Sequence, residues 1–98
     1  MKAYLVANLI PSAGGSESMQ FYASKVGQML AEAGGKNAKR VKLSEIINGS
    51  SLYQLMLFME FESKKAIQTV FESAEYKTLI PYRDKGFDMV NIQIFEDL

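Results

Sequence analysis

Apolar residues recur along the chain with two different periods, and their order predicts strands alternating with helices. Dense or alternating apolar runs predict four strands, because side chains on a strand point to opposite faces in turn. Apolar residues at steps of three and four predict amphipathic helices between the first two strands and before the last. The predicted strands span Lys2–Ile10, Lys39–Ile47, Leu52–Phe61 and Phe87–Glu96, and the predicted helices span Ser16 or Ser18 to Ala33, a segment after Ser63, and Ala74–Ile80.

Three residues mark the expected ends of helices. Ser63 and Ser73 each precede a helical segment, and a serine oxygen there accepts a hydrogen bond from an unpaired amide of the first turn. Gly34 follows the first helix, where glycine adopts the left-handed conformation that ends many helices. The region after Ser63 is therefore predicted to hold two consecutive capped segments.

Turn residues predict how the strands connect. The pair Asn48-Gly49 lies between the second and third strands and predicts a tight antiparallel hairpin. Pro81 is expected to end the helical segment, because proline disfavours helical geometry at the preceding Ile80. The segment Asp84–Gly86 is then expected to turn the chain into the last strand.

The resulting order, β-α-β-β-α-β, predicts an α+β ferredoxin-like domain with one antiparallel sheet and both helices on one face. A length of 98 residues corresponds to a single domain covering residues 1–98, with a core small enough to benefit from burying further surface.

The sheet is predicted to be apolar on both faces. One set of alternating positions is uniformly apolar and belongs under the helices. The other set would leave a contiguous apolar patch uncovered, larger than monomers usually expose. We therefore expect a homodimer formed through this face. The residues expected in the interface are Tyr4, Val6, Asn8, Gln54, Met56, Phe58, Met89 and Asn91.

Composition narrows the chemistry. Eleven basic and eleven acidic residues give no net charge, so neither nucleic acid nor a membrane is an expected partner. The chain has no cysteine and no histidine, which removes the commonest metal ligands and the usual proton shuttle at neutral pH. No phosphate-binding loop is present. We expect no metal and no cofactor. The N-terminal segment resembles a secretory signal only weakly, so a cytoplasmic location is expected.

Four residues are candidates for binding a small ligand: Tyr22, Glu60, Tyr76 and Arg83. Tyr76 and Arg83 together can hold an anion, because a guanidinium forks onto a carboxylate and a phenol adds a hydrogen bond. The alternative is structural, with Tyr76 packed beneath its helix and Arg83 paired with Glu60 or Glu75. Glu60 is either a proton acceptor or a salt-bridge partner. Tyr22 is predicted to face the layer between helix and sheet.

The segment Ser73-Ala74-Glu75-Tyr76, followed seven residues later by Arg83, resembles the family called domain of unknown function 1330, of the dimeric α/β barrel superfamily. Further similarity lies at Tyr22-Ala23 and Gly34-Gly35, and the resemblance spans most of the chain. The chain differs where the family tends to carry a glycine pair after Arg40. The resemblance implies a homodimer in which two sheets form one barrel, and it implies no established reaction.

The sequence thus specifies a fold and an assembly better than an activity. The first functional hypothesis is a homodimeric binding or interaction module for a small apolar or carboxylate ligand. The second is a cofactor-free oxygenase or isomerase acting on an activated aromatic or lactone substrate, although histidine, which often moves protons in enzymes, is absent. The third is RNA binding through strand aromatics; it lacks a basic residue and glycine at Gln54-Leu55, and Met56 replaces a stacking aromatic.

Overall fold

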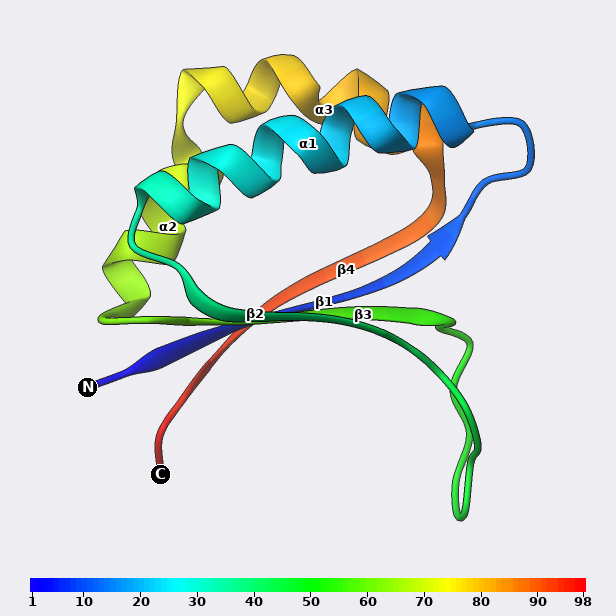
Figure 1. The fold of residues 1–98 in the computed structure, drawn as a ribbon, viewed down its shortest axis with the longest axis horizontal. Helices are drawn as coiled ribbons and strands as arrows, with labels where there is room; N and C mark the ends of the chain where they lie inside the picture. Colours follow the sequence, from blue (N-terminus) through cyan, green and yellow to red (C-terminus); the bar gives the residue numbers. More distant parts are fainter.

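Four strands form one antiparallel sheet, and three helices cover one of its faces, in the computed structural model, which describes residues 1–98 (Figure 1). The elements are β1 (Ala3–Pro11), α1 (Ser16–Glu32), β2 (Lys36–Lys42), β3 (Leu55–Phe61), α2 (Lys64–Glu72), α3 (Ala74–Gly86) and β4 (Phe87–Glu96). The strand order β2-β3-β1-β4 places β1 and β3 in the centre. The ferredoxin-like prediction is confirmed.

The two central strands carry the core because their alternating side chains face the helices. Leu5 lies opposite Met59 in β3 and opposite Ile94 in β4, and only 1% of Leu5 is exposed. Ala3 and Phe61 continue the same buried face. The helix-side face of the sheet therefore follows the alternation predicted from the sequence.

The helix ends form as the capping residues predict. The Ser63 hydroxyl accepts a hydrogen bond from the Ala66 amide at 3.3 Å, and the Ser73 hydroxyl accepts one from the Tyr76 amide at 3.1 Å. Gly34 follows α1 with a φ of 95°, a left-handed conformation that glycine adopts without steric cost. These three predictions are confirmed.

Helix α1 packs against both the sheet and α3. Its buried residues are Tyr22, Val26 and Leu30, which recur at four-residue steps and form the stripe that faces the core. At its first turn α1 approaches the end of α3 so closely that a Cβ on Gly86 would lie 2.7 Å from the Met19 backbone nitrogen. Only glycine permits that approach, which fixes the position of the helices over the sheet.

The second strand and its connection differ from the prediction. Strand β2 spans Lys36–Lys42 rather than Lys39–Ile47, and it pairs with β3 antiparallel as expected. Residues 43–54 form a long connection, so Asn48-Gly49 does not make the predicted tight hairpin, although Gly49 has a φ of 92°. The expectation of a short turn is wrong because the pairing of the two strands stops at Lys42 and Leu55.

Helix α3 continues past the proline that was expected to end it. Pro81 lies inside α3, which runs on to Gly86, so the segment Asp84–Gly86 is helical rather than a turn. Proline removes one helical hydrogen bond and usually disrupts a helix interior. Here Tyr76 and Leu79 are buried against the core, and this packing outweighs the lost bond. Pro81 itself is exposed.

The face of the sheet opposite the helices is uncovered within the chain (Figure 1). Rings of Tyr4 and Phe58 stack there with their centroids 5.5 Å apart, while Met56 and Met89 are 37% and 40% exposed. Gln54 lies just outside β3 and is exposed. The remaining members of the predicted interface, Val6, Asn8 and Asn91, are half-buried on β1 and β4.

The connection from β2 to β3 projects to the same uncovered side, away from the helices (Figure 1). Its apolar side chains are exposed, and they are Leu43, Ile46, Ile47 and Leu52. A loop in water usually carries polar residues, so this composition adds to the apolar surface that the chain leaves uncovered.

Candidate functional site

A cleft of about 450 Å³ lies between α1 and the sheet. Volumes of this size are typical of small-molecule sites. The lining is predominantly apolar and comes from the central strands, from β4 and from the inner face of α1. The main apolar residues lining it are Leu5, Leu9, Met19, Tyr22, Val26, Leu30, Leu55, Leu57, Met59, Phe71, Phe87, Val90 and Ile92. Side chains therefore do not completely fill the space between α1 and the sheet.

Two cations are the only charged residues that line this cleft, Arg40 and Lys42 of β2. Sequence reasoning did not select them as site residues. Their spacing of two positions on a strand places both on one face, so the sequence alone predicts that they lie side by side. Which face they occupy depends on the register of β2 with β3, which the sequence alone does not determine.

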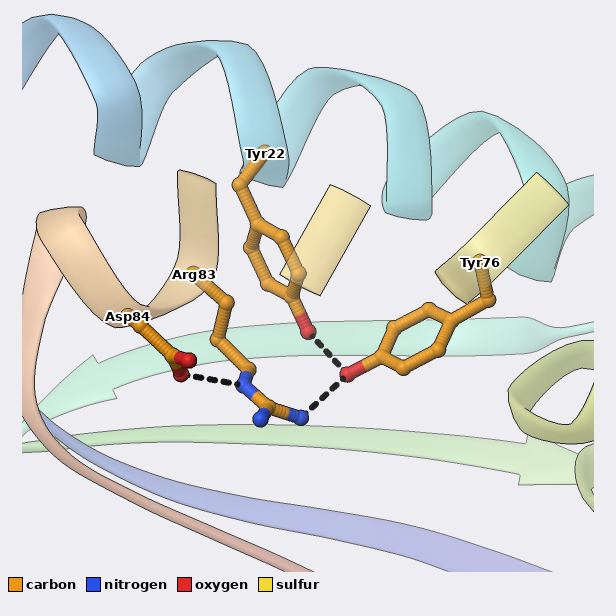
Figure 2. A network of polar contacts seen from close by, with 4 residues as sticks. All are labelled: Tyr22, Tyr76, Arg83 and Asp84. Atoms are coloured by element: carbon orange, nitrogen blue, oxygen red, sulfur yellow. Dashed lines mark hydrogen bonds and ion pairs between the residues drawn. The ribbon is translucent and has the colours of Figure 1, made fainter. Parts of the chain in front are cut away.

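Beside the cleft, four polar side chains form a chain of contacts between the helix layer and the sheet (Figure 2). The phenol oxygens of Tyr22, on α1, and Tyr76, on α3, lie 2.8 Å apart. Arg83 donates from Nη1 to the Tyr76 oxygen at 3.1 Å and from Nε to the Asp84 carboxylate at 3.2 Å. Three of the four predicted ligand-binding residues thus meet in one cluster.

The environment of the cluster sets its protonation. Burial, helped by the hydrogen bond with Tyr76, raises the pKa of the Tyr22 phenol well above its ordinary value, so this hydroxyl is neutral at physiological pH. Burial lowers the pKa of Arg83, but the hydrogen bonds to Tyr76 and Asp84 outweigh it and the pKa is raised. The cluster therefore combines the charged guanidinium of Arg83, paired with the Asp84 carboxylate, and the neutral phenol of Tyr22.

The cluster and the cleft share a wall. Tyr22 lines the cleft, and a second depression of about 510 Å³, lined by Arg83, Asp84 and Asp88, shares Phe87, Val90 and Ile92 with it. The side chain of Arg83 is 26% exposed, and it lines this depression.

Glu60 does not join the other three candidates. It lies opposite Tyr4 on β1, on the face away from the helices, where its carboxylate accepts a hydrogen bond from Asn37. The predicted partners of Arg83 are also corrected, since its carboxylate partner is neither Glu60 nor Glu75 but the adjacent Asp84. Because Arg83 and Asp84 are neighbours in the chain, they can form this ion pair without any contact between distant segments.

The arrangement is suited to binding rather than to proton transfer. Tyr76 is 3% exposed and its ring packs edge-on against Tyr22 and Phe71, which fits the structural alternative for this residue. The neutral Tyr22 phenol can donate a hydrogen bond but is a poor base at neutral pH. No group of three or more acidic side chains is placed to hold a metal ion, and no helix is both long and apolar enough to cross a membrane.

The raised pKa of Tyr22 predicts a loss of stability in alkali. Above about pH 10 the unfolded chain releases the Tyr22 proton while the folded protein retains it, so each further pH unit favours unfolding by about 1.4 kcal/mol. This contribution is fully present below pH 10 and is lost as pH rises toward the folded pKa. Urea unfolding from about pH 9 to 11 should show a steeper decline in the wild type than in Tyr22→Phe. The same decline with pH in both proteins would contradict a raised pKa of Tyr22.

The fold is that of the ferredoxin-like α+β proteins, and solved structures of this class resemble it over nearly the whole chain. A protein of unknown function from Rhodopseudomonas palustris aligns with a TM-score of 0.78 and 13% identity, covering 99% of this chain and 82% of that one. A dimeric ferredoxin-like protein of unknown function from Jannaschia sp. CCS1 aligns with a TM-score of 0.75 and 13% identity, covering 99% and 100%.

The chain belongs to the family described as domain of unknown function 1330, which matches residues 2–98. The resemblance noted in the sequence is thereby confirmed. A more distant structural relative is a cofactor-independent oxygenase from Streptomyces nogalater, with a TM-score of 0.72, 7% identity, and coverage of 98% of this chain and 92% of that one. No curated protein sequence matches the chain.

Proposed function

We propose that this protein is a homodimeric domain that binds a small molecule in the cleft between α1 and the sheet. The observation that carries the proposal is the cleft itself. Protein interiors are usually packed without large voids, yet here about 450 Å³ remains open among apolar side chains. An apolar ligand that enters this space removes both its own surface and that of the lining from water.

The uncovered sheet face supports the dimer. Met56, Met89 and Phe95 are each more than a third exposed on that side, and structural relatives of the same fold are described as dimeric. A second copy of the sheet provides a complementary apolar surface. The alternative of RNA binding needs the same face, which this dimer would occupy.

Filling the cleft tests the binding site. A Cβ on Gly27 would have only the Arg40 Nη2 atom within 4 Å, at 3.4 Å, so a leucine at this position has room to extend into the cleft that Gly27 lines. Nile red, an uncharged dye that fluoresces in apolar surroundings, should bind the wild type and bind Gly27→Leu about tenfold more weakly, a difference of about 1.4 kcal/mol.

Gly27→Ala is the matched control. It adds a single methyl group and improves helix propensity by about 1 kcal/mol, so it should stabilise α1 and leave dye affinity within about twofold. Equal dye binding by the wild type, Gly27→Ala and Gly27→Leu would show that the dye does not occupy the cleft, and absence of dye binding to the wild type would count against a ligand site there.

A second candidate function is cofactor-free oxygenation or isomerisation of an activated aromatic or lactone substrate. It is favoured by the likeness to the cofactor-independent oxygenase and by the phenol of Tyr22, which lines the cleft. Oxygen uptake with an electron-rich hydroxylated aromatic, compared between wild type and Tyr22→Phe, tests it. Uptake no faster than without protein would exclude that substrate class.

A further inference from the structure

Arg40 and Lys42 both lie on the helix side of the sheet. In the register of the two strands Arg40 is opposite Leu57 and Lys42 is opposite Leu55, and both leucines line the cleft. Residues that face each other across antiparallel strands lie on the same side of the sheet. The two side chains are thus at the mouth of an apolar cleft, on β2, one of the two outer strands of the sheet.

Neither cation has an anionic partner in the chain. The one ion pair in the structure joins Arg83 to Asp84, and no aspartate or glutamate lines the cleft. Surface lysines and arginines are often unpaired, but two that border the same apolar cleft create a site with a positive rim and no internal counter-charge. An anionic group on a ligand would be attracted there.

We propose that the ligand is a small amphipathic carboxylic acid, with its apolar body in the cleft and its carboxylate bound by Arg40 and Lys42. This inference rests on the proposed function and specifies its ligand class. The planar guanidinium of Arg40 pairs with the two oxygens of a carboxylate, and the Lys42 ammonium adds a point charge. The lining is mostly apolar, with Gln20 and Tyr22 as its uncharged polar side chains, so it suits an aliphatic or aromatic body better than a sugar or a peptide backbone, which needs many hydrogen-bond partners.

The geometry also gives Arg40 a route to the ligand. Its Nη2 atom lies 3.4 Å from the position of a Cβ on Gly27, so the guanidinium extends from β2 toward α1 across the cleft mouth. A side chain at Gly27 would share this space. A methyl group at residue 27 would be in ordinary van der Waals contact with this guanidinium.

Decanoate, decanol and inorganic phosphate separate the contributions of charge and apolar body. Isothermal titration of the wild-type protein should show decanoate binding about tenfold more tightly than decanol, and no binding of phosphate at the same concentration. Added salt should weaken the binding of decanoate and leave the binding of decanol unchanged, because ions screen only the charged contact. Equal affinities for decanoate and decanol, or tight binding of phosphate, would overturn the proposal.

Variants of β2 locate the charge. Arg40→Gln should weaken the binding of decanoate by about tenfold, and the double variant that also carries Lys42→Gln should weaken it further. The affinity for decanol should be unchanged in both variants. Lys39→Gln is the matched control, since Lys39 belongs to the same strand but lies opposite Phe58 on the other face. All three side chains are exposed, so loss of folding is not expected, and circular dichroism checks it.

The outcomes distinguish this inference from the proposed function. If decanol and Nile red bind the cleft but Arg40→Gln leaves decanoate unchanged, the ligand is apolar and the carboxylate assignment is wrong. If none of these probes binds, the proposed function fails together with it. Equal weakening by Lys39→Gln and Arg40→Gln would show that only the general charge of β2 matters, which also contradicts the assignment.

Discussion

Phe58→Asp is expected to convert a dimer into a monomer. Phe58 stacks on Tyr4 in the middle of the uncovered sheet face, and an aspartate there would place an unpaired charge between two apolar sheets. Such a charge costs about 3–5 kcal/mol in each copy, enough to dissociate a small interface at micromolar concentration. Light scattering after size-exclusion chromatography measures the change in mass.

Two further variants make this result interpretable. Met56→Asp alters a more exposed position on the same face, so it should dissociate the dimer even if Phe58→Asp folds poorly. Phe21→Asp is the control on the outer side of α1, where Phe21 packs on Tyr82, and it should remain dimeric. A wild type with the mass of one chain, or dimeric Phe58→Asp and Met56→Asp variants, would refute the proposed interface.

Tyr76→Phe is expected to destabilise the protein by about 1–3 kcal/mol, although it removes only one oxygen atom. The Tyr76 hydroxyl is the partner of both the Tyr22 phenol and the Arg83 guanidinium. Without it the buried Tyr22 hydroxyl loses its hydrogen bond, and an unsatisfied buried polar group carries its full desolvation penalty. Urea unfolding measures the loss.

Tyr82→Phe provides the comparison on the same helix. Tyr82 is 42% exposed, and its hydroxyl has no hydrogen-bond partner in the chain, so its removal should change stability by no more than about 0.5 kcal/mol. Similar losses for the two variants would mean that the cluster does not stabilise the fold. A stable Tyr76→Phe with weakened ligand binding would instead indicate that Tyr76 contributes to recognition.

The sequence predicts the order of elements and the two faces of the sheet because burial imposes strict periodicity on β1, β3 and α1. It fails for β2, whose seven residues are all exposed. No alternation is required of such a strand, and the apolar residues Leu43, Ile46 and Ile47 beyond it shift the predicted boundaries. The prediction that Pro81 ends the helix is wrong for a related reason. Local backbone preference does not take account of the packing of Tyr76 and Leu79, which holds α3 together past the proline.

The candidate site is only partly accessible to the same reasoning. Tyr22, Tyr76 and Arg83 meet because α1 and α3 lie side by side, and the spacing of Tyr76 and Arg83 on one helix makes their contact predictable. Glu60 is far from this cluster because it alternates on β3 with the buried residues Met59 and Phe61, and therefore points to the face away from the helices. The cleft depends on how completely side chains fill the space between the layers, which no pattern of apolar positions determines.

Strand β2 also limits how the protein aggregates. It is one of the two outer strands of the sheet, the other being β4, and one side of its backbone is free to pair with a strand from another molecule. Its seven residues include Lys36, Lys39, Arg40 and Lys42, and lysine on such an edge opposes further strand addition. Repulsion between two β2 strands therefore disfavours growth of the sheet into fibrils through this edge.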